Sequence, residues 1–80
     1  MSEGIKKLNR ILSKVLAISE GSINDETSPQ NTETWDSYNA LMLVSELERE
    51  FNLHFTMDEV INVKNVGDIK TALRKYNIEL

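Results

Sequence analysis

The spacing of apolar residues near the N-terminus most strongly limits the folds open to this chain. Between positions 5 and 16 they recur at steps of three and four, with basic and polar residues between them. They are Ile5, Leu8, Ile11, Leu12, Val15 and Leu16. This is the period of an amphipathic α-helix. We expect a helix over about residues 3–18, with Gly21 placed to finish the turn.

Residues 37–51 predict a second helix with two distinct surfaces. One broad apolar stripe should be core, and it comprises Ala40, Leu41, Leu43, Val44, Leu47 and Phe51. Tyr38 and Met42 fall on a different face, so we expect a small exposed apolar strip just beyond Ser37. The alternative is that Tyr38 and Met42 cover the loop before the helix.

The last third of the chain predicts two more helices. Thr56 and Glu59 form a capping box before a short helix at about residues 57–62. Asn65 caps a closing amphipathic helix at about residues 66–76. Because no segment alternates like a strand, the expected fold is all-α. It is a single domain over residues 1–80, a four-helix bundle with three longer helices, a short third helix and a long first loop.

The long first loop covers about residues 19–36 and is mostly polar. Its only large apolar residues are Ile23 and Trp35, which we expect to pin it onto the helices. A loop of this length is unusual in so small a domain, and such loops are usually either functional or disordered.

Length and composition exclude several classes of function. A chain of 80 residues buries only about 60 to 65% of its unfolded surface, which argues against a deep enclosed catalytic cavity. The chain has no cysteine, so it has no disulfide, thiolate metal site or thiol nucleophile of its own. No apolar run approaches the roughly 20 residues of a membrane span, and no signal peptide is seen. We expect a cytoplasmic monomer.

The charges are distributed unevenly along the chain. The net charge is −4, which argues against nucleic acid as a partner. Residues 1–16 carry +3 and residues 70–80 carry +2, so the centre of the chain carries −9. This pattern favours basic partners that meet the centre of the chain. A solvated acidic surface is the alternative.

Arrangements typical of enzymes are mostly missing. His54 is the only histidine, and no second metal ligand lies at helical spacing from it. A hydrolase would need His54 beside Ser37, but the intervening helix would separate them by about 20 Å. Glu46 and Glu50 have the spacing of a solvated helix face.

The order of these features resembles the acyl carrier protein family over nearly the whole chain. The resemblance rests on the polar loop, on Asp36 and Ser37 followed by a large residue, and on the helices that come after them. The matching helix positions are Leu41, Leu43, Val44, Leu47, Glu48 and Phe51. Tyr38 departs from the family pattern, where leucine or methionine is usual. Thr34 and Trp35 replace the usual preceding glycine.

The resemblance implies a carrier rather than a catalyst. A phosphopantetheinyl transferase would attach 4′-phosphopantetheine from coenzyme A to Ser37, and Asp36 would engage that transferase or its metal. An acyl or aminoacyl group would then be held as a thioester on the arm's sulfur. The implied partners are an acyl- or aminoacyl-loading ligase and a downstream transferase or synthase. The alternative is an unmodified, carrier-like helical module for protein–protein interaction.

The resemblance also implies where partners and cargo bind. Docking would run along the second helix, and the candidate docking residues are Tyr38, Met42, Glu46, Arg49 and Glu50. Met42 stands where the family usually has an acid, so we infer a dedicated partner with an apolar pocket. Short acyl chains would lie between the second and third helices, near Leu47 and Ile61.

Overall fold

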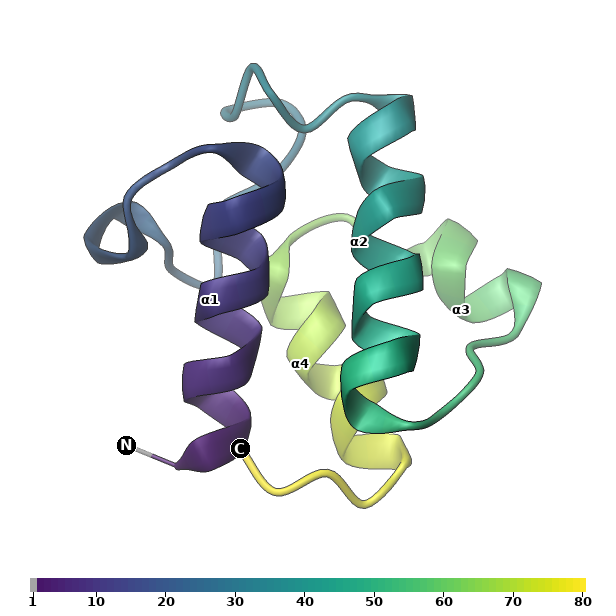
Figure 1. Ribbon diagram of the computed structural model, residues 1–80. Helices are drawn as coiled ribbons and strands as arrows, with labels where there is room; N and C mark the ends of the chain where they lie inside the picture. The colour runs from purple at the N-terminus through teal and green to yellow at the C-terminus, as the bar shows by residue number, and fades with distance from the viewer. Residues whose placement is uncertain (1) are drawn as a thin grey trace.

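The computed structural model describes residues 2–80, and every regular element in this range is helical (Figure 1). The four α-helices are α1 (Glu3–Leu16), α2 (Ser37–Phe51), α3 (Met57–Asn62) and α4 (Val66–Lys75). A short 3₁₀ helix, η1 (Glu20–Ser22), lies in the first loop. In Figure 1, α1 and α2 stand side by side, α4 crosses behind them and the short α3 lies on the far side of α2 from α1. The expected all-α, four-helix fold is confirmed.

Polar side chains at the helix starts bind the first free backbone N–H groups. Ser2 Oγ accepts from Ile5 N at 3.1 Å, and Asn65 Oδ1 accepts from Asp68 N at 2.8 Å. Thr56 and Glu59 form the expected reciprocal capping box at α3. Each cap satisfies a donor that has no partner within its helix.

The end of α1 differs from the sequence prediction. The helix stops at Leu16, because Ala17 takes a left-handed conformation with φ 54° and its N–H bonds to Ser13 O. Ser13 Oγ also donates to Ile18 O at 2.6 Å, which holds the turn. Gly21 has no positive φ and lies in η1. The prediction that Gly21 finishes the turn after α1 is therefore wrong, because Ala17 does so.

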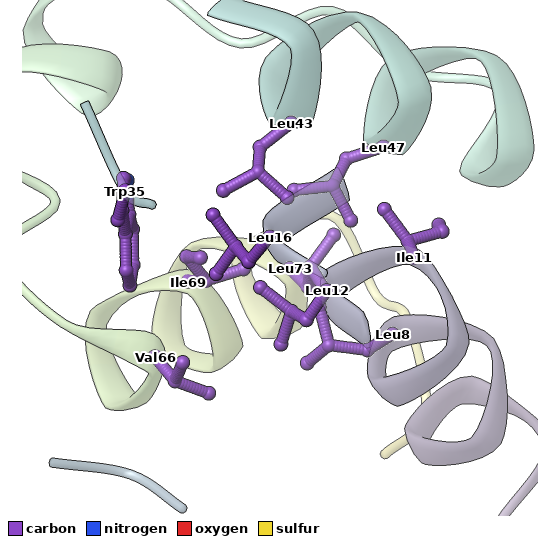
Figure 2. Packing of buried hydrophobic residues seen from close by; sticks show 10 residues of the cluster. All are labelled: Leu8, Ile11, Leu12, Leu16, Trp35, Leu43, Leu47, Val66, Ile69 and Leu73. Carbon is purple, nitrogen blue, oxygen red and sulfur yellow. The ribbon is translucent and has the colours of Figure 1, made fainter. Parts of the chain in front are cut away.

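The core lies where α1, α2 and α4 meet (Figure 2). Its buried members are Leu8, Ile11, Leu12, Leu16, Trp35, Leu43, Leu47, Val66, Ile69 and Leu73. The prediction that Leu41 belongs to this core is wrong, because its side chain is exposed. Since α3 has only six residues and none of them is buried, the cover on that side of α2 is incomplete.

The long first loop is fastened to the start of α4. Val66 N donates to Thr27 O and Gly67 N donates to Asp25 O, both at 2.9 Å. Lys70 Nζ also lies 2.6 Å from Asp25 Oδ1. Trp35 is buried and Ile23 packs against the core, as expected. The loop therefore satisfies N–H groups that α4 cannot satisfy internally.

Candidate functional site

Asp36 and Ser37 have separate roles at the start of α2. Asp36 is the N-cap residue, and its Oδ1 accepts from Asn39 N at 2.9 Å. Ser37 is the first helical residue and is exposed. Within residues 2–80, its hydroxyl has no hydrogen-bond partner. Because Asp36 does the capping, the Ser37 hydroxyl is not engaged at the helix start.

The surroundings of Ser37 suit an anion such as a phosphodiester. Ser37 lies at the positive end of a helix of 15 residues, where backbone N–H groups lack intrahelical partners. No residue of the first turn of α2 is acidic, and the one neighbouring carboxylate, that of Asp36, already accepts from Asn39 N. A phosphate on the Ser37 oxygen would therefore be stabilised by the helix dipole and by nearby N–H groups.

A cavity of about 410 Å³ opens beside Ser37 and runs between α2, α3 and α4. Its apolar lining residues are Pro29, Trp35, Ala40, Leu43, Val44, Leu47, Phe55, Val60, Val63, Ile69 and Ala72. Asp36, Ser37 and Glu59 are the polar members. A cavity of this size and polarity can hold a small apolar ligand.

One of the two predicted pocket residues is misplaced. Leu47 lines the cavity, as expected, but Ile61 does not and points into solvent. The lining residue on α3 is its neighbour Val60. On a helix, one residue corresponds to a rotation of about 100°, so a shift of one position moves a side chain from the cavity to the surface.

Glu59 is tied to α4 through Tyr76. The Tyr76 phenol oxygen lies 2.6 Å from Glu59 Oε1 and 2.8 Å from His54 O, so its proton can be donated to either acceptor. This hydrogen bond, together with that from Thr56 N, lowers the pKa of Glu59. The same contact with Glu59 raises the pKa of Tyr76. Glu59 is thus an ionised structural group on the cavity wall.

Two of the acidic residues on α2 are half-buried and engaged by neighbouring groups of the protein. Glu46 pairs with Arg49, and only 16% of the Glu46 side chain is exposed. Glu48 Oε2 accepts from Phe55 N at 2.9 Å and lies 3.8 Å from His54 Nδ1. The expectation that Glu46 belongs to a solvated face is therefore wrong. Glu50 is exposed, as expected.

Tyr38 and Met42 are exposed, so the expected apolar strip beyond Ser37 is confirmed. The alternative, that they cover the loop, is wrong.

Across residues 2–80, no cluster of three or more His, Cys, Asp or Glu side chains is placed to bind a metal. In the same range, no helix is long and apolar enough to cross a membrane.

Sequence reasoning missed most of the cavity wall. Trp35 was assigned only to pinning the loop, and Pro29 and Phe55 were given no role. Trp35 stands directly before Asp36 in a polar loop, and a single indole in such a loop is the sequence feature from which the cavity could have been predicted.

The model of the phosphopantetheine attachment site family matches residues 6–73. An acyl carrier protein from Buchnera aphidicola is 30% identical over 71 residues, which cover 89% of this chain and 91% of the relative. The chain belongs to the acyl carrier protein family. The cofactor of this family is covalently attached 4′-phosphopantetheine, and the free hydroxyl at the start of α2 fits it.

A solved structure extends the likeness from sequence to fold. A candidate acyl carrier protein from Mycobacterium tuberculosis superposes with a TM-score of 0.82 at 23% identity. The match covers 91% of this acyl carrier protein and 97% of the other chain. The expected family and fold are therefore confirmed.

Proposed function

We propose that this protein carries acyl intermediates on a 4′-phosphopantetheine arm attached to Ser37 and presents them to partner enzymes. The observation that carries the proposal is the exposed Ser37 hydroxyl, left free because Asp36 caps α2. When bound, the arm supplies the thiol that the chain lacks and holds the cargo as a thioester.

Each residue at the start of α2 has a proposed part in the attachment. Ser37 Oγ forms the new P–O bond as the pyrophosphate bond of coenzyme A breaks, adenosine 3′,5′-bisphosphate leaves, and the hydroxyl proton passes to solvent. Asp36 Oδ1 is engaged by Asn39 N, which leaves Oδ2 for the transferase or its metal. The N–H groups of the first turn of α2 hold the phosphate charge.

The cavity favours an acyl cargo over an aminoacyl one. Its wall is almost wholly apolar, and the carboxylate of Glu59 is already engaged by Tyr76 and Thr56. A charged ammonium group placed along Leu47 would therefore lose its hydration among apolar side chains, whereas a hydrocarbon chain there gains by burial.

The proposed partners are a phosphopantetheinyl transferase, an acyl-loading ligase and a downstream transferase or synthase. They would dock on α2, where Tyr38, Met42 and Glu50 are exposed and Glu46 is paired with Arg49. We also propose that the protein acts as a monomer in the cytoplasm and does not itself catalyse a reaction.

Intact mass spectrometry tests the attachment directly. The apo protein is incubated with coenzyme A and a promiscuous phosphopantetheinyl transferase, and a single pantetheinyl adduct is expected. Ser37→Ala should abolish the adduct completely. Ser45→Ala, which removes another exposed serine of α2, should leave it unchanged. Folded wild-type protein that gains no adduct would instead favour an unmodified interaction module.

A further inference from the structure

Helix α3 forms a thin wall of the cavity and buries little apolar surface of its own. It has six residues, and none of them is buried. Phe55 and Val63, which lie on either side of it, pack against the core. Between these two points, α3 contributes Glu59 and Val60 to the cavity wall. Apolar burial therefore holds the segments that flank this wall better than the wall itself.

One side chain joins the start of α3 to the end of α4. The Tyr76 hydroxyl lies 2.6 Å from Glu59 Oε1 and 2.8 Å from His54 O. The Tyr76 ring meets the Phe55 ring edge to face, with the centroids 5.7 Å apart. Among residues 2–80, the contact with Glu59 is the only hydrogen bond that links α3 to another helix. Tyr76 thus holds this side of the cavity through three neighbours.

The Tyr76–Glu59 hydrogen bond has the properties of a latch that can open. Thr56 N also donates to Glu59 Oε1, at 2.7 Å, so the carboxylate is held in one orientation. Hydrogen bonds to a carboxylate are stronger than those between neutral groups. Both Tyr76 and Glu59 are only half-buried. Water can therefore replace the bond when it opens, and no unpaired polar group is left buried.

The latch lies at the far end of the cavity from Ser37. Ser37 and Leu47 both line the cavity and lie about 15 Å apart along the axis of α2, at about 1.5 Å per residue. Phe55 N donates to Glu48 Oε2 at 2.9 Å, so Phe55 lies beside this far end of α2. The Glu59 carboxylate accepts from the backbone N–H that follows Phe55. A chain that enters beside Ser37 therefore meets the latch last.

We propose that Tyr76 limits the length of the acyl chain that the cavity accepts, because it holds the α3 wall in place through Glu59. The inference rests on the proposed function and adds the length of the cargo. A chain that ends near Leu47 leaves the latch closed. A longer chain displaces α3 and breaks the Tyr76–Glu59 bond. The loss of such a bond offsets the burial of about two to four methylene groups.

The test is the melting temperature of carriers loaded with acyl chains of increasing length. A promiscuous phosphopantetheinyl transferase loads the apo protein from acyl-coenzyme A, with saturated chains from butanoyl to hexadecanoyl. The melting temperature of the wild type should rise with chain length up to a limit and then stop rising. Tyr76→Phe loses both hydrogen bonds and keeps the ring contact with Phe55. It should move the limit to chains about two to four methylene groups longer.

Two control variants separate the latch from general stability. Glu59→Gln keeps an oxygen that accepts from Tyr76 and from Thr56 N, so it should retain the wild-type limit. Ser2→Ala removes the cap of α1, where Ser2 Oγ accepts from Ile5 N. It should lower the melting temperature of every loaded form equally and leave the limit unchanged.

Amide hydrogen exchange of the apo protein provides a second readout, which does not depend on the cargo. Val60 N bonds to Thr56 O, and Val63 N bonds to Val60 O. In Tyr76→Phe both amides should exchange about tenfold faster, because local opening of α3 no longer breaks the latch. In Ser2→Ala they should exchange at the wild-type rate.

The outcomes distinguish this inference from the proposed function. If Tyr76→Phe has the wild-type limit, or if Ser2→Ala shifts the limit as much, the inference is overturned while the adduct on Ser37 still forms. A wild type without a limit, or unchanged amide exchange in Tyr76→Phe, overturns it as well. No adduct on folded wild-type protein removes both proposals.

Discussion

At the scale of single residues, Asp36 and Ser37 show how adjacent side chains acquire different functions. Both residue types favour helix starts, so the sequence left open which of them caps α2. In the structure Asp36 binds Asn39 N and Ser37 is left without a hydrogen bond among the described residues. The exposed hydroxyl at the proposed attachment position is thus left unpartnered because its neighbour caps the helix.

Tyr76 provides a prediction at the same scale, on the pH dependence of stability. Its hydroxyl lowers the pKa of Glu59 below the ordinary 4.5, so this contribution to stability is present above pH 4.5 and is lost as pH falls through the folded pKa. Tyr76→Phe should lower the melting temperature at neutral pH and reduce the loss of stability between about pH 6 and about pH 3. Thermal unfolding followed by circular dichroism across this range measures both effects.

The control for Tyr76→Phe is Tyr38→Phe, because Tyr38 is exposed. It should leave both quantities unchanged. Phenylalanine at position 76 keeps the edge contact with Phe55, whose ring centroid lies 5.7 Å away. The ionisation of Tyr76 itself has the opposite pH dependence. Because its pKa is raised in the folded protein, it contributes stability below pH 10, and this contribution is lost as pH rises through the folded pKa. Equal acid sensitivity of Tyr76→Phe and wild type would contradict this account.

At the scale of elements, the end of α1 shows what periodicity leaves undetermined. The apolar spacing placed the helix, but the sequence could not indicate that Ala17 takes the left-handed conformation usually taken by glycine. The bond of Ile18 N to Ser13 O depends on this conformation. An alanine there carries a conformational cost that its neighbours offset.

Ala17→Gly should therefore stabilise the protein, by about 1 kcal/mol, because glycine takes a positive φ without a steric penalty. Ala17 is exposed, so no packing is lost. Urea unfolding measures the change. Ala40→Gly, in the interior of α2, should have the opposite sign and destabilise by about 1 kcal/mol. If both variants destabilise equally, the conformational explanation fails.

The helices could be predicted well from the sequence, whereas the site could be predicted only in part. Helix caps and the 3.6-residue apolar period are local properties of the sequence. Thr56, Asn65 and the apolar spacing in α1 were therefore sufficient to predict these helices. The exposure of Leu41 and Ile61 depends on how far α3 covers α2, which is a tertiary property. The contact of Glu48 with Phe55 N likewise required the path of the chain after α2, whereas the Glu46–Arg49 pair is an i, i+3 contact within α2 that the sequence itself indicates.

At the scale of the whole molecule, the C-terminal residues lie against the start of α1 (Figure 1). A Cβ atom on Gly4 would overlap Glu79 O and lie 2.8 Å from Leu80 Cδ2. Ile78 and Leu80 pack against the core, so this contact closes one end of the bundle. Glycine at position 4 is required by this close approach rather than by its own φ.

Gly4→Ala should destabilise the protein by about 1 to 3 kcal/mol, because the added methyl group displaces the C-terminal backbone from α1. Gly21→Ala is the matched control, since a Cβ atom there meets nothing within 4 Å. Its effect should lie within about 0.5 kcal/mol of zero. Urea unfolding of both variants measures the change in the free energy of unfolding. Equal changes would contradict a role for the contact between Gly4 and the C-terminal residues.

Trp35 is placed where its fluorescence reports on the contents of the cavity. It is the only tryptophan of the chain, and it lies in the wall of the cavity immediately before Asp36 and Ser37. Indole emission responds to the polarity of its surroundings. In the proposed role, a hydrocarbon chain that displaces water from the cavity changes the light emitted by this one side chain. The intrinsic fluorescence of Trp35 therefore allows loading of the carrier to be followed in real time without an added label.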